Sequence, residues 1–428
     1  MLYNRTVLDN GITVVSEPMD SVRSITLGVW FAVGSRDEAP HEAGLSHFME
    51  HMMFKGTPTR TAKDISEEFD RMGAELNAGT SKEYTMYYAR FLDEHLPKAF
   101  ELLGDMVVNS SCADEECERE RKVVIEEIGR MEDNPEDLVG EIFEAALWPT
   151  HPIGLPIIGT RDTVGTFGHA EAVEFRRKHF ITGNVVVAAA GNVNHEELVA
   201  LAETCLADLP TGARTSRTLG SPSEQNAVAC VERDTEQAHI LLGVLTMDSR
   251  DPDRFPLQLM SDVLGGGMSS RLFQKIREQR GLAYAVQTFP SLHQDTGEFC
   301  VYVGTNPENT ELVLGLIKEE FADIATNGVT SEELARAKES ASGHLVLSTE
   351  ATRTRMVRMG RAEACDTEVL SAEDVIERLN AVSMDDVKRV AQRVLSAPST
   401  LAIVGPFDEA QVAAFASQGS LLAEENPA

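Results

Sequence analysis

Hydrophobic residues recur along the chain with two different periods, and these periods predict strands and helices in turn. Short runs rich in Val, Ile and aromatic residues alternate with longer segments in which apolar residues return every three or four positions. Asp9-Asn10-Gly11 is a typical hairpin turn, and Gly73 follows the last turn of a helical segment. The predicted strands up to residue 109 are 5–8, 12–16, 24–33, 74–80 and 84–91, and the predicted helices are 44–53, 63–72 and 96–109.

The next segment, from Asp114 to the Asn134-Pro135 pair, predicts one long helix. Acidic residues crowd its first turn, where the helix dipole favours negative charge, and Pro135 is expected to end it. Glu120 and Glu127 are seven positions apart, so they share a face with apolar side chains. Because a lone carboxylate is costly on such a face, we expect a cationic group to meet them.

The alternation of strands and helices continues through the rest of the chain. Predicted helices are 171–179 and 195–206, with further helices as far as 394, and predicted strands are 185–190, 297–304 and 400–404. Between them, 210–223 combines Pro, Gly, Ser and Thr and is the best linker in the sequence.

Beyond this linker the sequence repeats itself. The repeated pairs are Leu27-Gly28-Val29 with Leu242-Gly243-Val244, and Ser35-Arg36-Asp37 with Ser249-Arg250-Asp251. Their offsets are 215 and 214 in a chain of 428 residues, which two copies of one fold explain. We therefore expect two homologous halves, 1–212 and 225–428, joined by a linker at 213–224.

The helix predicted at 44–53 carries His47, Glu50 and His51 in the pattern H-x-x-E-H. Residues four apart on a helix lie on one face with their Cβ atoms about 5–6 Å apart, which suits two nitrogen ligands of one metal ion. Glu50 stands beside that face without being the natural third ligand, and it is better placed to hold and deprotonate a water molecule. The pattern is the inverse of the H-E-x-x-H metalloprotease motif.

Chance is a poor explanation of this triple. Histidine is scarce, with 11 in 428 residues, so two His and one Glu at these offsets arise about 0.03 times per chain of this composition. A buried core histidine or a capping pair explains either His alone, but it does not explain the triple.

The second half lacks this chemistry. At the repeat offset the three motif positions correspond to Ser261, Leu264 and Gly265. Gly265-Gly266-Gly267 precede a predicted helix there, and such a run cradles phosphate in some proteins. The lysine of a P-loop is absent, so we expect the glycines to permit a flexible or closely packed backbone rather than nucleotide binding.

Composition and charge narrow the choice of partners. Hydrophobic residues make up 42% of the chain, enough for a sizeable core, and no apolar run is long enough to cross a bilayer. The net charge of −31 argues against nucleic acid and anionic membranes as partners. It favours basic peptides, although a solvated acidic surface explains the same balance.

The cysteines and the N-terminus bear on the compartment. Six cysteines are spread thinly with no C-x-x-C spacing, which indicates reduced thiols rather than a disulfide framework or a metal site. The first residues contain neither an apolar export segment nor an amphipathic leader. We therefore expect a cytoplasmic protein.

Several motifs together resemble the pitrilysin/insulysin-type inverzincin metallopeptidases. They are His47-Phe48-Met49-Glu50-His51, Gly73-Ala74-Glu75-Leu76-Asn77-Ala78, the helix with Glu120 and Glu127, and the run from Gly265 to Phe273. The length fits the short-chain branch that includes the mitochondrial processing peptidase β subunit and its bacterial relatives, and the similarity covers nearly the whole chain.

This resemblance assigns roles to individual residues. It implies that Glu127 is the third zinc ligand and that Glu120 assists catalysis. It implies that Arg277 and Tyr284 of the second half bind the substrate near the metal. It also implies that the strand with Asn77 and Ala78 is an edge onto which the peptide adds as a further strand.

The chemistry read from the residues agrees with the resemblance. Two His and one Glu leave the fourth tetrahedral position of Zn²⁺ to water, as in catalytic zinc sites, and Glu50 is the expected general base. The ligand types favour zinc, one ion per chain, over manganese or cobalt.

We expect an α+β protein of two homologous halves, each with helices on a mainly antiparallel sheet, that form a clamshell chamber. Its expected function is zinc-dependent endopeptidase action on short or unfolded peptides bound by β-augmentation. The resemblance implies a homodimer or a heterodimer with a related chain. The alternative from another class is a non-catalytic structural or binding subunit, although such chains typically lack part of the His/Glu set, which is complete here.

Overall fold

The computed structural model describes residues 3–217, 219–220 and 226–416, so the predicted linker lies partly outside the described residues. The chain divides into two compact units. The first comprises Met1–Gly129, Leu155–Thr218 and Ser348–Ser371, and the second comprises Arg130–Gly154, Leu219–Leu347 and Ala372–Ala428. Each unit is a sheet with packed helices, which confirms the predicted α+β class. Within the described residues, no helix is both long enough and apolar enough to span a membrane.

The first unit is built on a six-stranded, mainly antiparallel sheet. Its strands are β1 (Asn4–Val7), β2 (Thr13–Pro18), β3 (Ser24–Phe31), β4 (Glu75–Thr80), β5 (Thr85–Leu92) and β6 (Val185–Gly191). They lie in the order β1-β2-β6-β3-β5-β4, and only β2 and β6 pair in parallel. The predicted hairpin is confirmed, and Gly11 supplies the positive φ of 97° in its turn.

The second unit is built on a five-stranded sheet with the same topology. Its strands are β7 (Ala227–Glu232), β8 (Ala238–Thr246), β9 (Ala283–Leu292), β10 (Gly297–Thr305) and β11 (Ser399–Gly405). Their order is β7-β11-β8-β10-β9, and only β7 and β11 pair in parallel. Strand for strand this is the order β2-β6-β3-β5-β4 of the first sheet, which confirms the predicted repeat.

Helices cover both faces of each sheet. In the first unit they are α1 (Leu45–Met52), α2 (Ala62–Arg71), α3 (Leu96–Asn109), α4 (Asp114–Asp133, which extends into the second unit), α6 (Arg161–Val164), α7 (His169–His179), α8 (His195–Cys205) and α12 (Thr352–Ala364). In the second they are α5 (Pro135–Leu147), α9 (Arg254–Gly265), α10 (Thr310–Asn327), α11 (Ser331–Ser348), α13 (Ala372–Ala381), α14 (Met384–Leu395) and α15 (Glu409–Ala416).

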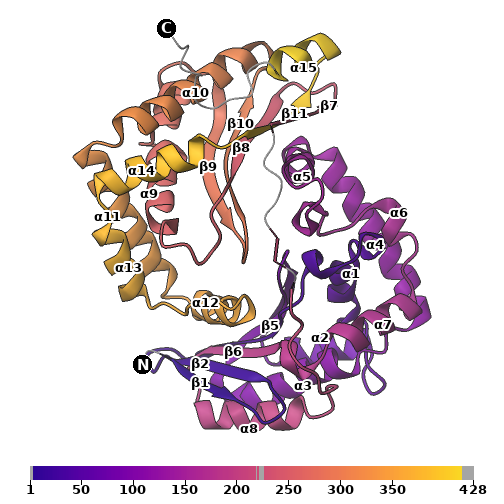
Figure 1. Ribbon diagram of the computed structural model, residues 1–428. Helices are drawn as coiled ribbons and strands as arrows, with labels where there is room; N and C mark the ends of the chain where they lie inside the picture. Colours follow the sequence, from indigo (N-terminus) through magenta and orange to yellow (C-terminus); the bar gives the residue numbers. More distant parts are fainter. Residues whose placement is uncertain (1–2, 218, 221–225, 417–428) are drawn as a thin grey trace. The chain divides into compact units, whose positions relative to one another are not determined.

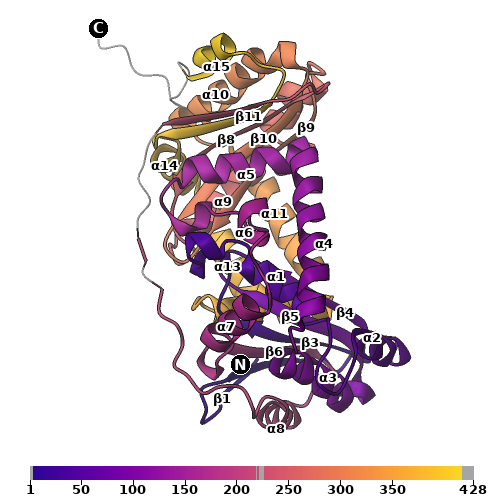
Figure 2. The ribbon, with the colours of Figure 1, turned by 90° about the vertical axis from the view of Figure 1, so that its right-hand side faces the viewer.

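Each sheet receives one helix from the other half of the sequence. Figure 1 shows α12 on one face of the first sheet and α3 and α8 on the other. Figure 2 shows α5 and α10 on opposite faces of the second sheet. The apolar cluster under α12 joins Trp30 to Met356 and Met359, and the cluster under α5 joins Phe143 to Tyr302. Both sheets are therefore buried on two faces, which accounts for the continuous apolar runs in their central strands.

The repeated glycines make room for these exchanged helices. Gly28 in β3 and Gly243 in β8 hold the same place in the two sheets, paired with β5 and β6 in one and with β10 and β11 in the other. A Cβ atom on Gly28 would lie 2.8 Å from Met356 Sδ of α12, and one on Gly243 would lie 2.9 Å from Phe143 Cζ of α5. The repeat thus preserves a packing requirement as well as a sequence.

The sequence pattern did not predict helix α5. The prediction that Asn134-Pro135 ends a helix is confirmed, since α4 ends at Asp133. The same pair also begins α5, because Pro135 takes its first position and the Asn134 side chain accepts a hydrogen bond from Glu136 N at 3.2 Å. Proline is favoured at the first position of a helix as well as after one, so the pattern alone did not reveal α5.

His179, at the end of α7, is a titratable group inside the first core. It is 2% exposed, its ring centroid lies 4.5 Å from that of Phe175, and neither ring nitrogen has a hydrogen-bond partner among the described residues. Burial lowers its pKa to about 4; the charge of Lys178 lowers it further, and Asp37 and Glu42 oppose this shift. The neutral ring is the form that the fold accommodates.

The pH dependence of stability follows from this shift. A histidine in the unfolded chain titrates near 6.5, so between about pH 6.5 and pH 4 the unfolded state binds the extra proton and stability falls as the pH falls. His179→Phe keeps an aromatic ring in the core and removes the group that binds this proton. In urea unfolding, we expect the wild type to lose about 2.5 kcal/mol more than the variant between pH 7 and pH 4.5. An equal loss in both proteins would contradict this account.

Candidate metal centre

Helix α1 positions the two histidines of the motif. Its apolar residues Leu45, Phe48, Met49 and Met52 are buried in the first core. His47 and His51 therefore lie together on the opposite face, with ring centroids 4.8 Å apart and side chains 17% and 18% exposed. The i, i+4 spacing of the sequence gives this arrangement directly.

Helix α4 brings a carboxylate to the same point. Glu127 Oε2 lies 3.8 Å from His47 Nε2 and 3.5 Å from His51 Nε2. One ligand atom from each of the three residues lies within 4.8 Å of the others. These distances are too long for hydrogen bonds. Ligands at about 2.0–2.1 Å from a tetrahedral zinc ion lie about 3.4 Å from each other. The two distances from Glu127 are close to this value, and the three donors are of the types that bind zinc.

The protonation state of His47 also suits a metal. Burial lowers the pKa of His47 to about 4, and the nearby His51 lowers it further, so the ring is neutral near pH 7. A neutral imidazole is the form that binds zinc. His51 Nδ1 lies 3.0 Å from Glu120 Oε2. The other ring nitrogen, Nε2, therefore faces Glu127 and is the one that can bind a metal.

A lysine completes the surroundings of Glu120. This carboxylate is 5% exposed, and Lys55 Nζ lies 2.6 Å from its other oxygen, Oε1. The expected cationic partner is thus present for Glu120, on the turn that follows α1. We expected Val123 to belong to the apolar face that Glu120 and Glu127 share. It is instead 42% exposed.

Glu50 is held beside the three donors. Its Oε2 accepts a hydrogen bond of 2.6 Å from Thr80 Oγ1, at the end of β4. Burial raises the pKa of Glu50, Thr80 and the His51 charge lower it, and the charge of Glu127 raises it. A carboxylate whose pKa is raised toward neutrality is a better proton acceptor for catalysis at neutral pH.

Strand β4, with Asn77 and Ala78, lies at the edge of the first sheet, as expected. The N–H of Ala78 donates to the Oδ1 of the Asn77 side chain at 2.8 Å. This backbone donor is therefore satisfied by a side chain rather than by a neighbouring strand.

Arg277 and Tyr284 lie together in the second unit. Arg277 Nη1 donates to Tyr284 O at 2.9 Å, and the guanidinium carbon lies 4.7 Å from the centre of the tyrosine ring. Tyr284 is 76% exposed. The guanidinium is also stacked on the ring of Phe273, at 4.8 Å. The pair forms an exposed unit with a phenol and a cation within the described second unit.

The glycine run is packed closely at its start. A Cβ atom on Gly265 would lie 2.6 Å from Thr288 N of β9, so glycine is required there for contact with the sheet. Arg271 of the same motif is bound by Glu333 at 2.7 Å and by Asp323 at 2.8 Å. Of the two expected alternatives, a flexible or a closely packed backbone, close packing holds at Gly265, whereas a Cβ atom on Gly267 would meet nothing within 4 Å.

Comparison with known proteins identifies the family. Residues 13–161 match the family described as Insulinase (Peptidase family M16), and residues 166–341 match the Peptidase M16 inactive domain. An uncharacterized zinc protease of Streptomyces coelicolor is 40% identical over 420 residues, which cover 95% of this chain and 90% of that protein. The chain belongs to peptidase family M16. It is a zinc protease of that family and hydrolyses peptide bonds.

A further relative agrees with this assignment, and solved structures share the fold. An uncharacterized zinc protease of Mycobacterium tuberculosis is 41% identical over 410 residues, covering 94% of this chain and 93% of the relative. A crystal structure of an M16 inactive domain from Pseudomonas fluorescens superposes with a TM-score of 0.89 at 23% identity, covering 95% and 99% of the two chains. A protease from Helicobacter pylori gives 0.86 at 22% identity, with 94% and 99% covered. These structures confirm the fold.

Three residues around the M16 site were missed by the sequence pattern. Thr80 and Lys55, which contact Glu50 and Glu120, belong to no local motif. Glu38 accepts the backbone N–H of Gly44 at 2.8 Å and that of Ser46 at 2.5 Å, and so caps α1 from outside the helix. Only its position shortly before the H-x-x-E-H helix hinted at a capping role.

Proposed function

We propose that this M16 protein is an endopeptidase that cleaves short or unfolded peptides, using one zinc ion held by His47, His51 and Glu127. The observation that carries the proposal is the convergence of these three donors with Glu50 beside them. Zinc at this position supplies a Lewis acid that polarises the scissile carbonyl and makes the attacking water more acidic.

The polar side chains around the three metal ligands each have a role in this reaction. Glu50, oriented by Thr80, accepts the proton of the attacking water and delivers it to the leaving amine. Glu120 holds His51 in the tautomer that presents Nε2. Lys55 in turn balances the charge of Glu120, which is otherwise a buried carboxylate.

Substrate binding is assigned to two places. The peptide adds to β4 in extended form and exchanges the Asn77 side chain for its own carbonyl at the N–H of Ala78. Arg277 and Tyr284 bind the carbonyl oxygen of the substrate, where a cation and a phenol stabilise developing negative charge. An acidic protein with a charge of −31 also favours basic peptides.

The endopeptidase claim has a direct test. A basic, unstructured peptide blocked at both termini is incubated with the zinc-loaded protein, and mass spectrometry identifies the products. We expect internal cleavage of the blocked peptide and no cleavage of a folded, disulfide-bonded protein that contains the same sequence. Cleavage of only the unblocked peptide, at its ends, would show an exopeptidase instead.

Oligomeric state and compartment stay predictions. A homodimer or a dimer with a related chain is the family expectation, and light scattering on the purified protein measures it. The cytoplasmic location is measured by fractionation of cells that produce the protein.

A further inference from the structure

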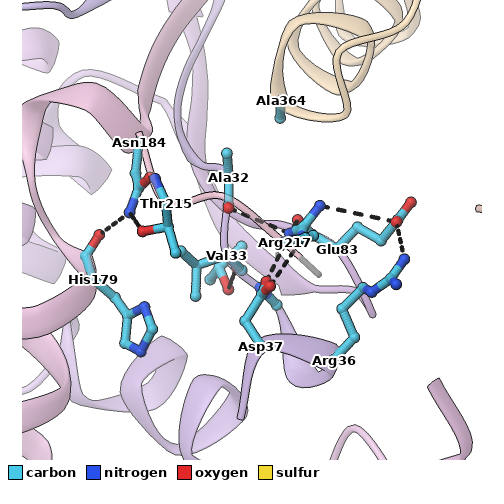
Figure 3. A network of polar contacts seen from close by, with 12 residues as sticks. Ala32, Val33, Arg36, Asp37, Glu83, His179, Asn184, Thr215, Arg217 and Ala364 are labelled. Carbon is cyan, nitrogen blue, oxygen red and sulfur yellow. Dashed lines mark hydrogen bonds and ion pairs between the residues drawn. The ribbon is translucent and has the colours of Figure 1, made fainter. Parts of the chain in front are cut away.

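We propose that Arg217, in the segment predicted to be a linker, is a positioning residue for the metal site. The inference rests on the proposed function, because it concerns the same zinc-binding helix. Arg217 stands at the end of the first unit, just before the chain passes into the second at Leu219. Figure 3 shows its guanidinium inserted among buried polar groups of the first unit.

The contacts of Arg217 hold its segment on the first unit. Its side chain is 9% exposed. Nε and Nη2 each lie 2.7 Å from one carboxylate oxygen of Asp37, so the pair is bidentate. Nη2 also donates to the backbone oxygens of Glu83 and Ala32. A flexible tether would not bury a guanidinium in this way.

The Asp37 and Glu83 carboxylates belong to a balanced network. Arg36 Nη1 lies 2.7 Å from Glu83 Oε1, and Arg217 Nη1 lies 3.9 Å from the same oxygen. All four side chains are less than a tenth exposed. Two positive and two negative side chains meet here, so removing one of them takes an ion-pair partner from a buried charge.

One branch of this network leads to the histidines. Asp37 is held by Arg217, and the next residue, Glu38, binds the N–H groups of Gly44 and Ser46 with its two oxygens. These amides are at the N-terminus of α1, three residues and one residue before His47. Fixing Asp37 therefore fixes the residue that caps the zinc-binding helix.

The other branch leads to Glu50. Glu83 lies in the turn between β4 and β5, and this turn is tied to the loop before α1 by two backbone hydrogen bonds, Ser35 N to Ser81 O at 3.1 Å and Arg36 N to Lys82 O at 2.9 Å. Thr80, which binds the Glu50 carboxylate, is the residue just before this turn. Arg217 therefore binds both the segment that caps α1 and the turn next to Thr80.

The same segment offers a matched control. Arg214, three residues earlier, donates to Glu363 O at 3.0 Å and pairs with Asp366 at 3.1 Å, at the end of α12. It fastens the segment to the first unit without touching the loop before α1 or the β4–β5 turn. Arg214→Met therefore removes an arginine contact of similar chemistry from the same segment.

The test compares Arg217→Met with Arg214→Met in two measurements on the full chain. Zinc affinity is measured by competition with a chelator, and hydrogen–deuterium exchange of residues 39–53 is measured on metal-free protein. For Arg217→Met we expect at least a tenfold weaker zinc affinity, as for residues that orient metal ligands, and faster exchange at Gly44 and Ser46. For Arg214→Met we expect no change in either, whatever its effect on melting temperature.

The possible outcomes separate the proposals. If the wild type binds no zinc, the proposed function fails. If the wild type binds zinc and Arg217→Met matches it in affinity and exchange, or if both variants change alike, the role of Arg217 fails. Should Arg217→Met not fold, Arg217→Lys keeps the buried charge but lacks the bidentate fork, and we expect it to fold with intermediate zinc affinity. Wild-type affinity in Arg217→Lys would then overturn the proposal.

Discussion

Glu50→Gln is expected to abolish peptide cleavage while the protein keeps its zinc. The amide retains the size of the side chain and an oxygen that accepts from Thr80, so the local structure is preserved. It cannot accept a proton, so the attacking water keeps its proton and the leaving amine receives none. General acid–base catalysis contributes about 10²–10⁴-fold, and we expect kcat to fall by at least that much with KM little changed.

The controls for this variant are metal content and a neighbouring carboxylate. Zinc per chain, measured by mass spectrometry of the metal, should equal that of the wild type. Glu126→Gln removes an exposed carboxylate of α4 and should leave kcat and zinc unchanged. Full activity in Glu50→Gln would show that another group accepts the proton.

Glu127→Ala is expected to lose both zinc and activity. Glu127 is the donor that lies within 4 Å of both histidines, and without it two neutral imidazoles remain to hold the ion. Residues that merely orient ligands cost about 10–100-fold in affinity, so the loss of a ligand should exceed that range. Chelator competition measures the affinity, and the same samples are assayed for cleavage.

Glu126→Ala is the matched control for this variant, since it lies next to Glu127 on α4 and is exposed. It should bind zinc and cleave peptide as the wild type does. Glu127→Ala that retained stoichiometric zinc at wild-type affinity would remove Glu127 from the ligand set and leave the nearby Glu120 as the next carboxylate to examine.

The sequence predicted the parts of the site that depend on local spacing. His47 and His51 share a face because they are four apart in one helix, and the alternation of strands and helices gave most elements of the fold. Glu127 is 76 positions beyond His51, so no local rule connects them. The family resemblance supplied that residue, and the geometry of α4 is consistent with it.

Supporting residues were missed because their partners are distant in sequence. Glu38 caps a helix from outside it, Lys55 neutralises a carboxylate from another helix, and Arg217 lies in a segment whose composition predicts a linker. Composition reports the conformational freedom of an isolated segment, whereas a buried guanidinium is fixed by acids that only the tertiary fold brings to it.

The exchange of helices between the halves was hidden for a similar reason. Glycine at positions 28 and 243 appears in the sequence as part of a repeat, but its cause is the helix that packs on each sheet. In the structure, Met356 and Phe143 lie where a Cβ atom at these positions would clash with them. Repeats in sequence therefore indicate shared architecture before they indicate which contacts maintain it.

The most direct test of the zinc peptidase is cleavage of a quenched fluorescent, basic, unstructured peptide by the purified chain, with zinc measured on the same sample. A chelator is then added and removed, and zinc is restored. We predict about one zinc per chain, loss of cleavage with the chelator and recovery with zinc. Cleavage that persists after complete removal of zinc, or a chain that binds no zinc after reconstitution, would contradict this mechanism.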